Sequence, residues 1–258
     1  MGTALLDGVI RAQRVDPASV ALCDAYAPAV DALQRKHPGL TAYATGPEAV
    51  AASEVIILAV KPKDMQALLQ SLPEGGGNAL FISIAAGVTL SQLQQWLGAN
   101  QRVIRVMPNT PAQVGQGYSA FARASGVTDA DADLARQIFS AVGQVDEVPE
   151  YLLDAITGLS GSGPAYIFTI IEALADGGVL MGLPRAAALR AAAQTVLGAA
   201  QMVLNTGEHP ASLRDAVTSP GGTTIAGLEQ LEAHGLRNAL LQAVRKATER
   251  SKELGKGA

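Results

Sequence analysis

The chain has 258 residues, of which 48% are hydrophobic and 16% are charged, so it is long enough for one large core or two ordinary ones. Its formal net charge of -4 creates no field that attracts nucleic acid or anionic lipid, which excludes nucleic-acid binding as a function. The single cysteine, Cys23, excludes an intrachain disulfide, and no apolar run is convincing as a membrane span. We therefore expect a cytoplasmic protein that has neither a nucleic-acid nor a membrane partner.

In the first part of the chain, short β-rich runs alternate with stretches long enough to form crossover helices. The runs are VALCD (residues 20–24), TAYA, EVIILAV (residues 54–60), ALFISIA (residues 79–85), RVIRVMP and GYSAFA. Near-continuous apolar strands separated by helices predict a parallel sheet covered on both faces. Gly87 and Asn109 follow two of these strands, at the carboxyl ends where open α/β sheets bind their ligands.

The second part of the chain loses the strands and shows only helical patterns. We expect helices at residues 164–181, 184–205, 212–217, 223–233 and 236–253, with Pro184 in the first turn of the second and Gly207 at its end. Residues 186–204 are apolar almost all round, so this helix needs burial on most sides. We predict an α/β domain over residues 1–149 and an all-α domain over residues 150–258 that forms a homodimer, or a higher oligomer built from dimers.

A glycine-rich stretch, SPGGTT at residues 219–224, interrupts the helical half. Pro220 restricts one φ angle, whereas Gly221 and Gly222 allow conformations that other residues avoid. A turn of this kind before a helix points backbone N–H groups outward and favours a carboxylate. The alternative is a helix start with Thr223 as its cap and no ligand, and the pattern alone leaves both interpretations open.

Five motifs occur in one order: AVKP (residues 59–62), MPNTPA (107–112), GLSGSGPAY (158–166), ALADGGVLMGLPR (173–185) and SPGGTTIAGLEQLE (219–232). With these motifs the chain resembles the pyrroline-5-carboxylate reductase family over essentially its whole length. The resemblance implies a Rossmann-type NAD(P)-binding domain followed by a helical domain for dimerisation and substrate binding. It also implies reduction of the C=N bond of 1-pyrroline-5-carboxylate to give L-proline, by hydride transfer from NADPH or NADH.

The same resemblance implies roles for particular residues. The backbone amides of Gly222, Thr223 and Thr224, in the turn that Gly221 helps to form, hold the substrate carboxylate, and the Thr224 hydroxyl faces the ring nitrogen as the catalytic group. The residues expected to line the substrate pocket are Ser160, Ser162 and Gly163. The residues expected to bind the cofactor are Asp24, Ala59, Val60, Lys61, Pro62, Ala85, Gly87 and Asn109, the last on the nicotinamide or substrate side.

Other ionisable residues are expected to stay outside the chemistry. Glu172 and Asp176 are an i,i+4 acidic pair, which we interpret as structural rather than as an acid/base couple. Three scattered histidines and one cysteine predict no metal site.

The start of the chain departs from the family pattern, which opens with a buried strand and a glycine-rich turn. This chain matches only from the methionine after that turn, so the first strand and the phosphate-binding glycines are missing from it. We expect the reading frame to continue about ten residues upstream, enough for the missing strand and turn. A stop codon there would contradict this expectation.

Two alternatives follow from these departures. If the chain starts at Met1, we expect weak cofactor binding and a catalytically weak or silent helical homodimer. A related Rossmann reductase with another imine or hydroxy-acid substrate is disfavoured by SPGGTT and SGSGPAY. Asp24 ends the run VALCD, where an acidic side chain binds a ribose 2′-hydroxyl and disfavours a 2′-phosphate, so we expect NADH to be tolerated well.

Overall fold

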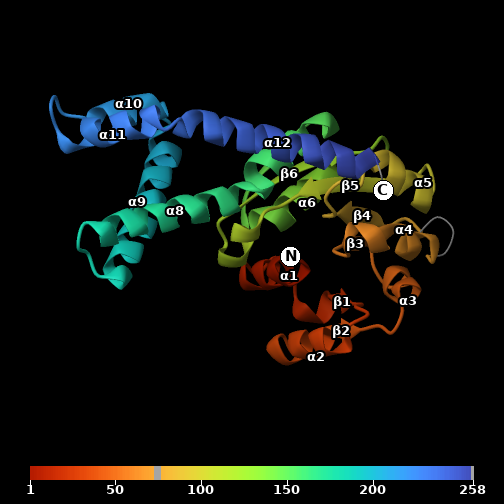
Figure 1. Cartoon of the computed structure of the whole chain (residues 1–258). Helices are drawn as coiled ribbons and strands as arrows, with labels where there is room; N and C mark the ends of the chain where they lie inside the picture. Colours follow the sequence, from red (N-terminus) through yellow and green to blue (C-terminus); the bar gives the residue numbers. More distant parts are fainter. Residues whose placement is uncertain (73–76, 257–258) are drawn as a thin grey trace. The chain divides into compact units, whose positions relative to one another are not determined.

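The computed structural model describes residues 1–72 and 77–256 and separates into two compact units, whose elements are labelled in Figure 1. The first unit contains Met1–Ser162 together with Arg245–Ala258, and the second contains Gly163–Val244. This boundary differs from the predicted one at residue 150. Residues 150–162 and the last turns of the chain pack with the sheet rather than with the other helices, through contacts described below.

The first unit holds two sheets. The smaller is a parallel pair, β1 (Ala21–Leu22) and β2 (Thr41–Ala42). The larger has the order β3-β4-β5-β6-β7, with the strands Val55–Leu58, Leu80–Ser83, Arg102–Met107, Gly117–Arg123 and Gly143–Glu147. The predicted α/β class is confirmed, although the sequence reading did not include β7.

The expectation of a wholly parallel sheet is wrong at one strand pairing, between β5 and β6. β3, β4 and β5 are parallel, but β6 runs antiparallel to β5. The short turn η2 (Thr110–Val114) joins β5 to β6, whereas a parallel crossover needs a dozen or more residues. β7 returns parallel to β6 after a full helix, α6 (Asp129–Ser140).

β3 forms one edge of the larger sheet. In the described part of the chain, β1 and β2 pair only with each other, and no ladder joins β1 to β3. Ile57 in the middle of β3 is 36% exposed. The prediction of a missing first strand stays a prediction.

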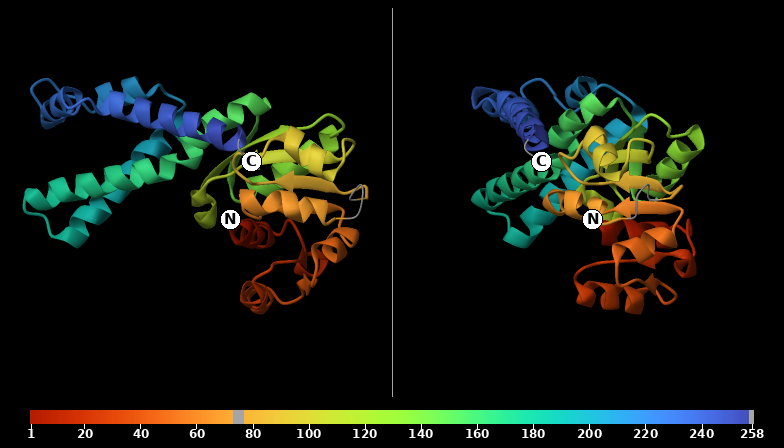
Figure 2. Two further views of the ribbon diagram at one scale, coloured as in Figure 1. Left: turned by 45° about the vertical axis from the view of Figure 1, so that its right-hand side comes forward. Right: turned by 90° about the vertical axis from the view of Figure 1, so that its right-hand side faces the viewer.

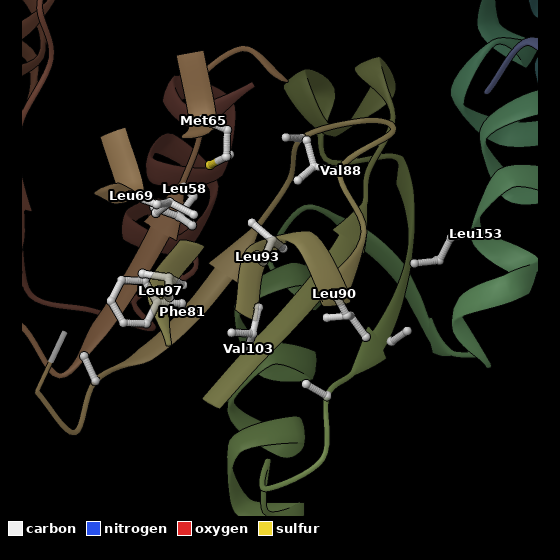
Figure 3. Packing of buried hydrophobic residues seen from close by; sticks show 14 of the residues in the cluster. Leu58, Met65, Leu69, Phe81, Val88, Leu90, Leu93, Leu97, Val103 and Leu153 are labelled. Atoms are coloured by element: carbon white, nitrogen blue, oxygen red, sulfur yellow. The ribbon is translucent and has the colours of Figure 1, made fainter. Parts of the chain in front are cut away.

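Successive strand residues point to opposite faces of the larger sheet, and both faces carry apolar side chains. Helices therefore cover both faces. Phe81 and Val103 pack on one face against α4 (Pro62–Gln70) and α5 (Leu90–Leu97), and Figure 3 shows this cluster. The opposite face, with Leu80, Ile82 and Ile104, packs against α1 (Gly2–Arg11) and α6. The other α-helices within residues 1–162 are α2 (Ala27–Lys36), α3 (Gly46–Ala51) and α7 (Leu153–Ile156), and the last part of α12 also belongs to this unit.

The second unit is entirely helical. Its helices are α8 (Gly163–Leu180), α9 (Arg185–Thr206), α10 (Pro210–Ala216), α11 (Thr223–Ala233) and the first part of α12 (Leu236–Lys256). Figure 2 shows α8 and α9 packed against each other next to the turn that joins them. Gly207 ends α9, as predicted, and adopts the left-handed conformation, whereas Pro184 is the N-cap residue of α9 instead of lying in its first turn.

The apolar faces of α8 and α9 are largely uncovered in the single chain. Only Ala175, Ala188 and Ala192 form a buried cluster, while Phe168 is 64% exposed and Leu180 is 83% exposed. Glu150–Leu180 and Arg185–Thr206 are long and apolar enough to cross a membrane by length and composition. Such a surface indicates a partner that covers it.

A partly buried ion pair links the start of β5 to α6. Arg102 donates to the Asp131 Oδ1 at 2.6 Å, and Asp131 also accepts from the Thr128 amide and hydroxyl at 3.0 and 2.8 Å. Burial raises the pKa of the Asp131 carboxyl, but the bonds from Thr128 and Arg102 outweigh burial and hold this pKa below its usual value of 3.8. The buried Arg102 Nε makes no hydrogen bond in the described structure, and Nη2 donates to the Asn78 carbonyl, so Asp131 supplies the anionic partner of this guanidinium.

We expect Asp131→Asn to lower the free energy of unfolding by about 1–3 kcal/mol at pH 7, because Arg102 loses its anionic partner. A lowered native pKa means that the stabilisation is present above pH 3.8 and is lost as the pH falls through the native value. The difference between wild type and variant, measured by urea denaturation, should therefore vanish in acid. Asp133→Asn at the exposed Asp133–Arg136 pair is the control and should change stability far less. A difference that persists unchanged in acid contradicts the prediction.

Candidate active site

The structure places most of the predicted cofactor residues at the carboxyl ends of the parallel strands of the larger sheet. β3, β4 and β5 are parallel and in register, so their carboxyl ends meet at one edge. The residues that follow these three strands are those of AVKP (59–62), then residues 85–87, and then Asn109. This edge is where open α/β sheets bind their ligands.

Accessibility differs among the residues at this edge. Ala59, Lys61 and Pro62 are exposed, whereas Val60 is half-buried. The predicted contacts Ala85 and Gly87 are buried, and Ala86 between them is exposed.

Two helix N-termini lie close to the end of β3. α4 begins at Pro62 with Lys61 as its N-cap, and no side chain caps it. α1 also lacks a side-chain cap, and a Cβ atom on Gly2 would lie 3.0 Å from the Ala59 Cβ. Uncapped helix N-termini favour anions, and Lys61 adds a positive charge. The residues present therefore fit the diphosphate of a dinucleotide.

Asp24 lies after β1, in the smaller sheet. Its Oδ1 accepts from the Tyr26 amide at 2.8 Å, so the carboxylate closes a local turn while it stays exposed. The second carboxylate oxygen makes no hydrogen bond among the described residues, which leaves an acceptor for a ribose hydroxyl.

Both ends of the Asn109 carboxamide are hydrogen-bonded within the protein. Its Nδ2 donates to the Ser160 carbonyl at 3.1 Å, and its Oδ1 accepts from the Tyr118 amide at 2.9 Å. Asn109 is 9% exposed. Its carboxamide thus joins the end of β5, the start of β6 and the segment that carries Ser160.

Ser160 lies in η4 (Thr157–Gly161), a short π-type turn between α7 and α8. The Ser160 hydroxyl donates to the Ile156 carbonyl at 3.2 Å. The Ser162 hydroxyl makes no hydrogen bond within the described residues, and both serines are half-buried. π-type turns are frequent at functional sites, and this one carries Ser160 and is followed directly by Ser162 and Gly163, the other two predicted pocket residues.

The glycine-rich turn of the second unit precedes α11. Gly221 has φ +68°, in the left-handed region, and Gly222 is the N-cap of the helix. The Gly222 amide donates to the Ser219 carbonyl at 3.0 Å, so it closes the turn and is not free for a substrate. Of the three predicted amides, the structure leaves those of Thr223 and Thr224, in the first helical turn where amides have no intrahelical partner.

The structure also shows which residue begins α11 and which further groups of this turn have no hydrogen-bond partner. Thr223 is the first helical residue rather than the cap, so the alternative of a Thr223 cap is wrong. The Thr224 hydroxyl makes no hydrogen bond within the described residues and remains available. The Ile225 amide, also in the first turn, adds a donor that could have been inferred by counting from the helix start.

A network around Arg105 was not recognised from the sequence. Arg105 on β5 has a side chain that is 5% exposed, and its guanidinium lies 3.1 Å from Glu150 and 4.0 Å from Asp154. Glu150 also accepts from the Leu90 amide at 2.7 Å, and Asp154 accepts from the Ser251 hydroxyl at 2.7 Å. The network attaches residues 150–154 and the end of α12 to the sheet.

The end of α12 also covers the loop after β4. A Cβ atom on Gly87 would lie 3.5 Å from the Gly255 amide nitrogen, and Gly87 adopts a left-handed φ of +78°. Gly87 therefore shapes the loop, and Ala86 is the residue of this loop that faces outward.

The other ionisable groups considered from the sequence are the Glu172–Asp176 pair and the histidine and cysteine side chains. Asp176 forms an ion pair with Arg185, which agrees with the structural interpretation of the Glu172–Asp176 pair. Among residues 1–72 and 77–256, no group of three or more His, Cys, Asp or Glu side chains is arranged to hold a metal ion.

Both parts of the chain match known protein-family models. Residues 150–254 match the family model described as pyrroline-5-carboxylate reductase dimerisation. Residues 1–87 match the model described as NADP oxidoreductase coenzyme F420-dependent.

Full-length relatives give the same result. A pyrroline-5-carboxylate reductase of Methanosarcina acetivorans is 50% identical over 257 residues, which cover 99% of this chain and 95% of that protein. The Escherichia coli K12 pyrroline-5-carboxylate reductase is 41% identical over 259 residues, with the same coverages. The crystal structure of Plasmodium falciparum pyrroline carboxylate reductase with NADP bound has a TM-score of 0.88 and 30% identity, covering 99% of this chain and 94% of that one. The chain belongs to the pyrroline-5-carboxylate reductase family.

Proposed function

We propose that this chain reduces 1-pyrroline-5-carboxylate to L-proline with NADPH or NADH, in proline biosynthesis in the cytoplasm. The observation that carries the proposal is 50% identity to a protein of that name over 99% of the chain. The match spans both the strand ends and the 219–224 turn. The relatives named as reductases give no support to the alternative of a silent homodimer.

The main contribution of the protein to this reaction is to bind the cofactor and the substrate and to orient them. The cofactor, when bound, supplies the hydride that adds to the imine carbon. The C=N π electrons then become the lone pair of the nitrogen, and a protonated substrate nitrogen makes this addition easier. Because the iminium already carries its proton, no strong acid or base is required of the chain.

The residues of the second unit suit the substrate. The free amides of Thr223 and Thr224 hold its carboxylate at the positive end of the α11 dipole. The Thr224 hydroxyl, which has no other partner in the described structure, faces the ring nitrogen. Gly221 and Gly222 shape the turn. The residues proposed to line the ring are Gly163 together with Ser160 and Ser162, which belong to the first unit.

The residues of the first unit suit the dinucleotide. Lys61 and the N-termini of α1 and α4 face the diphosphate, and Ala59, Val60 and Pro62 border it. Ala85 and Gly87 shape the next loop, and Asn109 lies toward the nicotinamide or the substrate. Asp24 accepts from the adenosine ribose.

We expect the enzyme to use NADH well, because Asp24 offers an anionic acceptor to the ribose 2′-hydroxyl and repels a 2′-phosphate. The values of kcat/KM with NADH and with NADPH test this expectation. A strong preference for NADPH that Asp24→Ala leaves unchanged would remove Asp24 as the discriminator.

We also propose a homodimer in which the exposed faces of α8 and α9 cover each other. Phe168, Leu180 and Met181 are 64%, 83% and 81% exposed in the single chain. The molar mass by light scattering, at several protein concentrations, should be at least twice that of the chain. A monomer in solution, or a protein recovered only with lipid vesicles, would contradict the proposal.

The proposed activity is tested by following oxidation of NADPH or NADH on addition of 1-pyrroline-5-carboxylate, with L-proline identified as the product. Thr224→Val keeps the side-chain shape but removes the hydroxyl. It should lower kcat while leaving the KM of the cofactor unchanged. Absence of substrate-dependent oxidation with both cofactors would overturn the proposed function.

A further inference from the structure

The starting observation is a carbonyl whose usual helical partner is missing. In an α-helix the Ser160 carbonyl accepts from the amide of residue 164, but residue 164 is proline and has no N–H. Asn109 replaces this donor, because its Nδ2 lies 3.1 Å from the Ser160 oxygen. A half-buried carbonyl without a partner would be unfavourable, so this side-chain bond satisfies a backbone group.

The opposite end of the carboxamide is equally constrained. The Asn109 Oδ1 accepts from the Tyr118 amide at 2.9 Å, at the start of β6. With both ends bonded and 9% exposure, the side chain has no freedom to rotate. The Asn109 side chain therefore holds η4 at a fixed place relative to β5 and β6.

Packing around η4 supports the same role. A Cβ atom on Gly161 would lie 2.7 Å from the Met107 Cε, so the turn lies directly against the end of β5. The Ser162 amide donates to the Thr157 carbonyl at 2.9 Å, in the wide π-type geometry. The turn is thus seated on the residues that immediately precede Asn109.

We infer that Asn109 is a positioning residue for the substrate pocket: its carboxamide holds η4 in the π-type geometry that presents Ser160 and Ser162. This inference rests on the proposed function. It assigns Asn109 an action through Ser160, whereas the sequence suggested direct contact with the nicotinamide or the substrate.

The test is Asn109→Asp, which keeps the shape and the acceptor for Tyr118 but turns an oxygen toward the Ser160 carbonyl. We expect kcat/KM for 1-pyrroline-5-carboxylate to fall roughly ten- to a hundredfold, because small displacements of positioning groups have effects of this size. The KM of NADPH should change less than twofold, a split that general destabilisation does not produce. Asn100→Asp, in an exposed loop, makes the same chemical change and should have no effect.

Hydrogen exchange of residues 157–163 provides a readout that needs no turnover. Both Asn109→Asp and Asn109→Ala should accelerate exchange there, and the melting temperature shows that each variant is folded. Unchanged exchange overturns the inference, and so does faster exchange with unchanged kcat/KM for the substrate. An inactive wild type overturns the proposed function instead, while the exchange result still decides whether Asn109 holds the turn.

Discussion

Arg105→Leu is expected to lower the free energy of unfolding by about 3 kcal/mol, at the low end of the range for breaking a buried ion pair. The substitution leaves the half-buried carboxylates of Glu150 and Asp154 without their cation. Their side chains are 33% and 22% exposed, which lets water compensate in part and sets the lower figure. Urea denaturation at one fixed protein concentration measures the effect, because a dimer links stability to concentration.

The network also predicts where the damage appears. Ser251 bonds to Asp154, so the last turns of α12 should exchange hydrogen faster in Arg105→Leu than in wild type. Arg105→Lys keeps the charge but lacks the planar fork, and should recover only part of the stability.

Arg237→Leu is the matched control for this prediction. Arg237 pairs with Glu232 on an exposed surface, where both side chains are more than half exposed. Such pairs contribute little to stability, so this variant should stay near wild type. A loss in Arg105→Leu no greater than in Arg237→Leu would show that the buried network does not stabilise the fold.

Gly221→Val is expected to lower kcat/KM for the substrate by about tenfold or more, with little change in the KM of the cofactor. Gly221 has φ +68°, a conformation that costs a non-glycine residue about 1–2 kcal/mol and a β-branched residue more. The turn should relax to another conformation. The Thr223 and Thr224 amides would then no longer converge on the carboxylate.

Gly126→Val is the control that distinguishes the effect of backbone strain on stability from the effect of Gly221→Val on substrate binding. Gly126 has φ +91°, and nothing lies within 4 Å of its Cβ position, as at Gly221. It lies in the loop between β6 and α6, away from every predicted site residue. Both variants should lose similar stability, but only Gly221→Val should lose substrate affinity. Equal kinetic losses would mean that the 219–224 turn has no special role in binding.

Local physics made much of the molecule predictable. The start of α11 at Thr223 and the left-handed Gly207 after α9 follow from turn chemistry over a few residues. The apolar strands and their carboxyl ends follow from periodicity. For that reason, the AVKP residues, residues 85–87 and Asn109 were expected at one edge of a sheet.

Features that depend on contacts between distant segments were not predictable. The antiparallel direction of β6, the bond from Asn109 to Ser160 and the position of the end of α12 are of this kind. A buried arginine in a central strand does require an anionic partner, but nothing local indicates that Glu150 and Asp154 supply it.

The class of fold, the family and the residues at the strand ends and in the glycine-rich turn could be predicted from the sequence, because each depends on short-range pattern or on several motifs together. Which of those groups are free to bind depends on contacts that form only in the folded chain. The Gly222 amide is used by Ser219, and Gly87 lies under the end of α12, whereas the Thr224 hydroxyl remains available. A hydrogen bond or a covered surface is a relation between two segments, and a linear pattern shows only one of them.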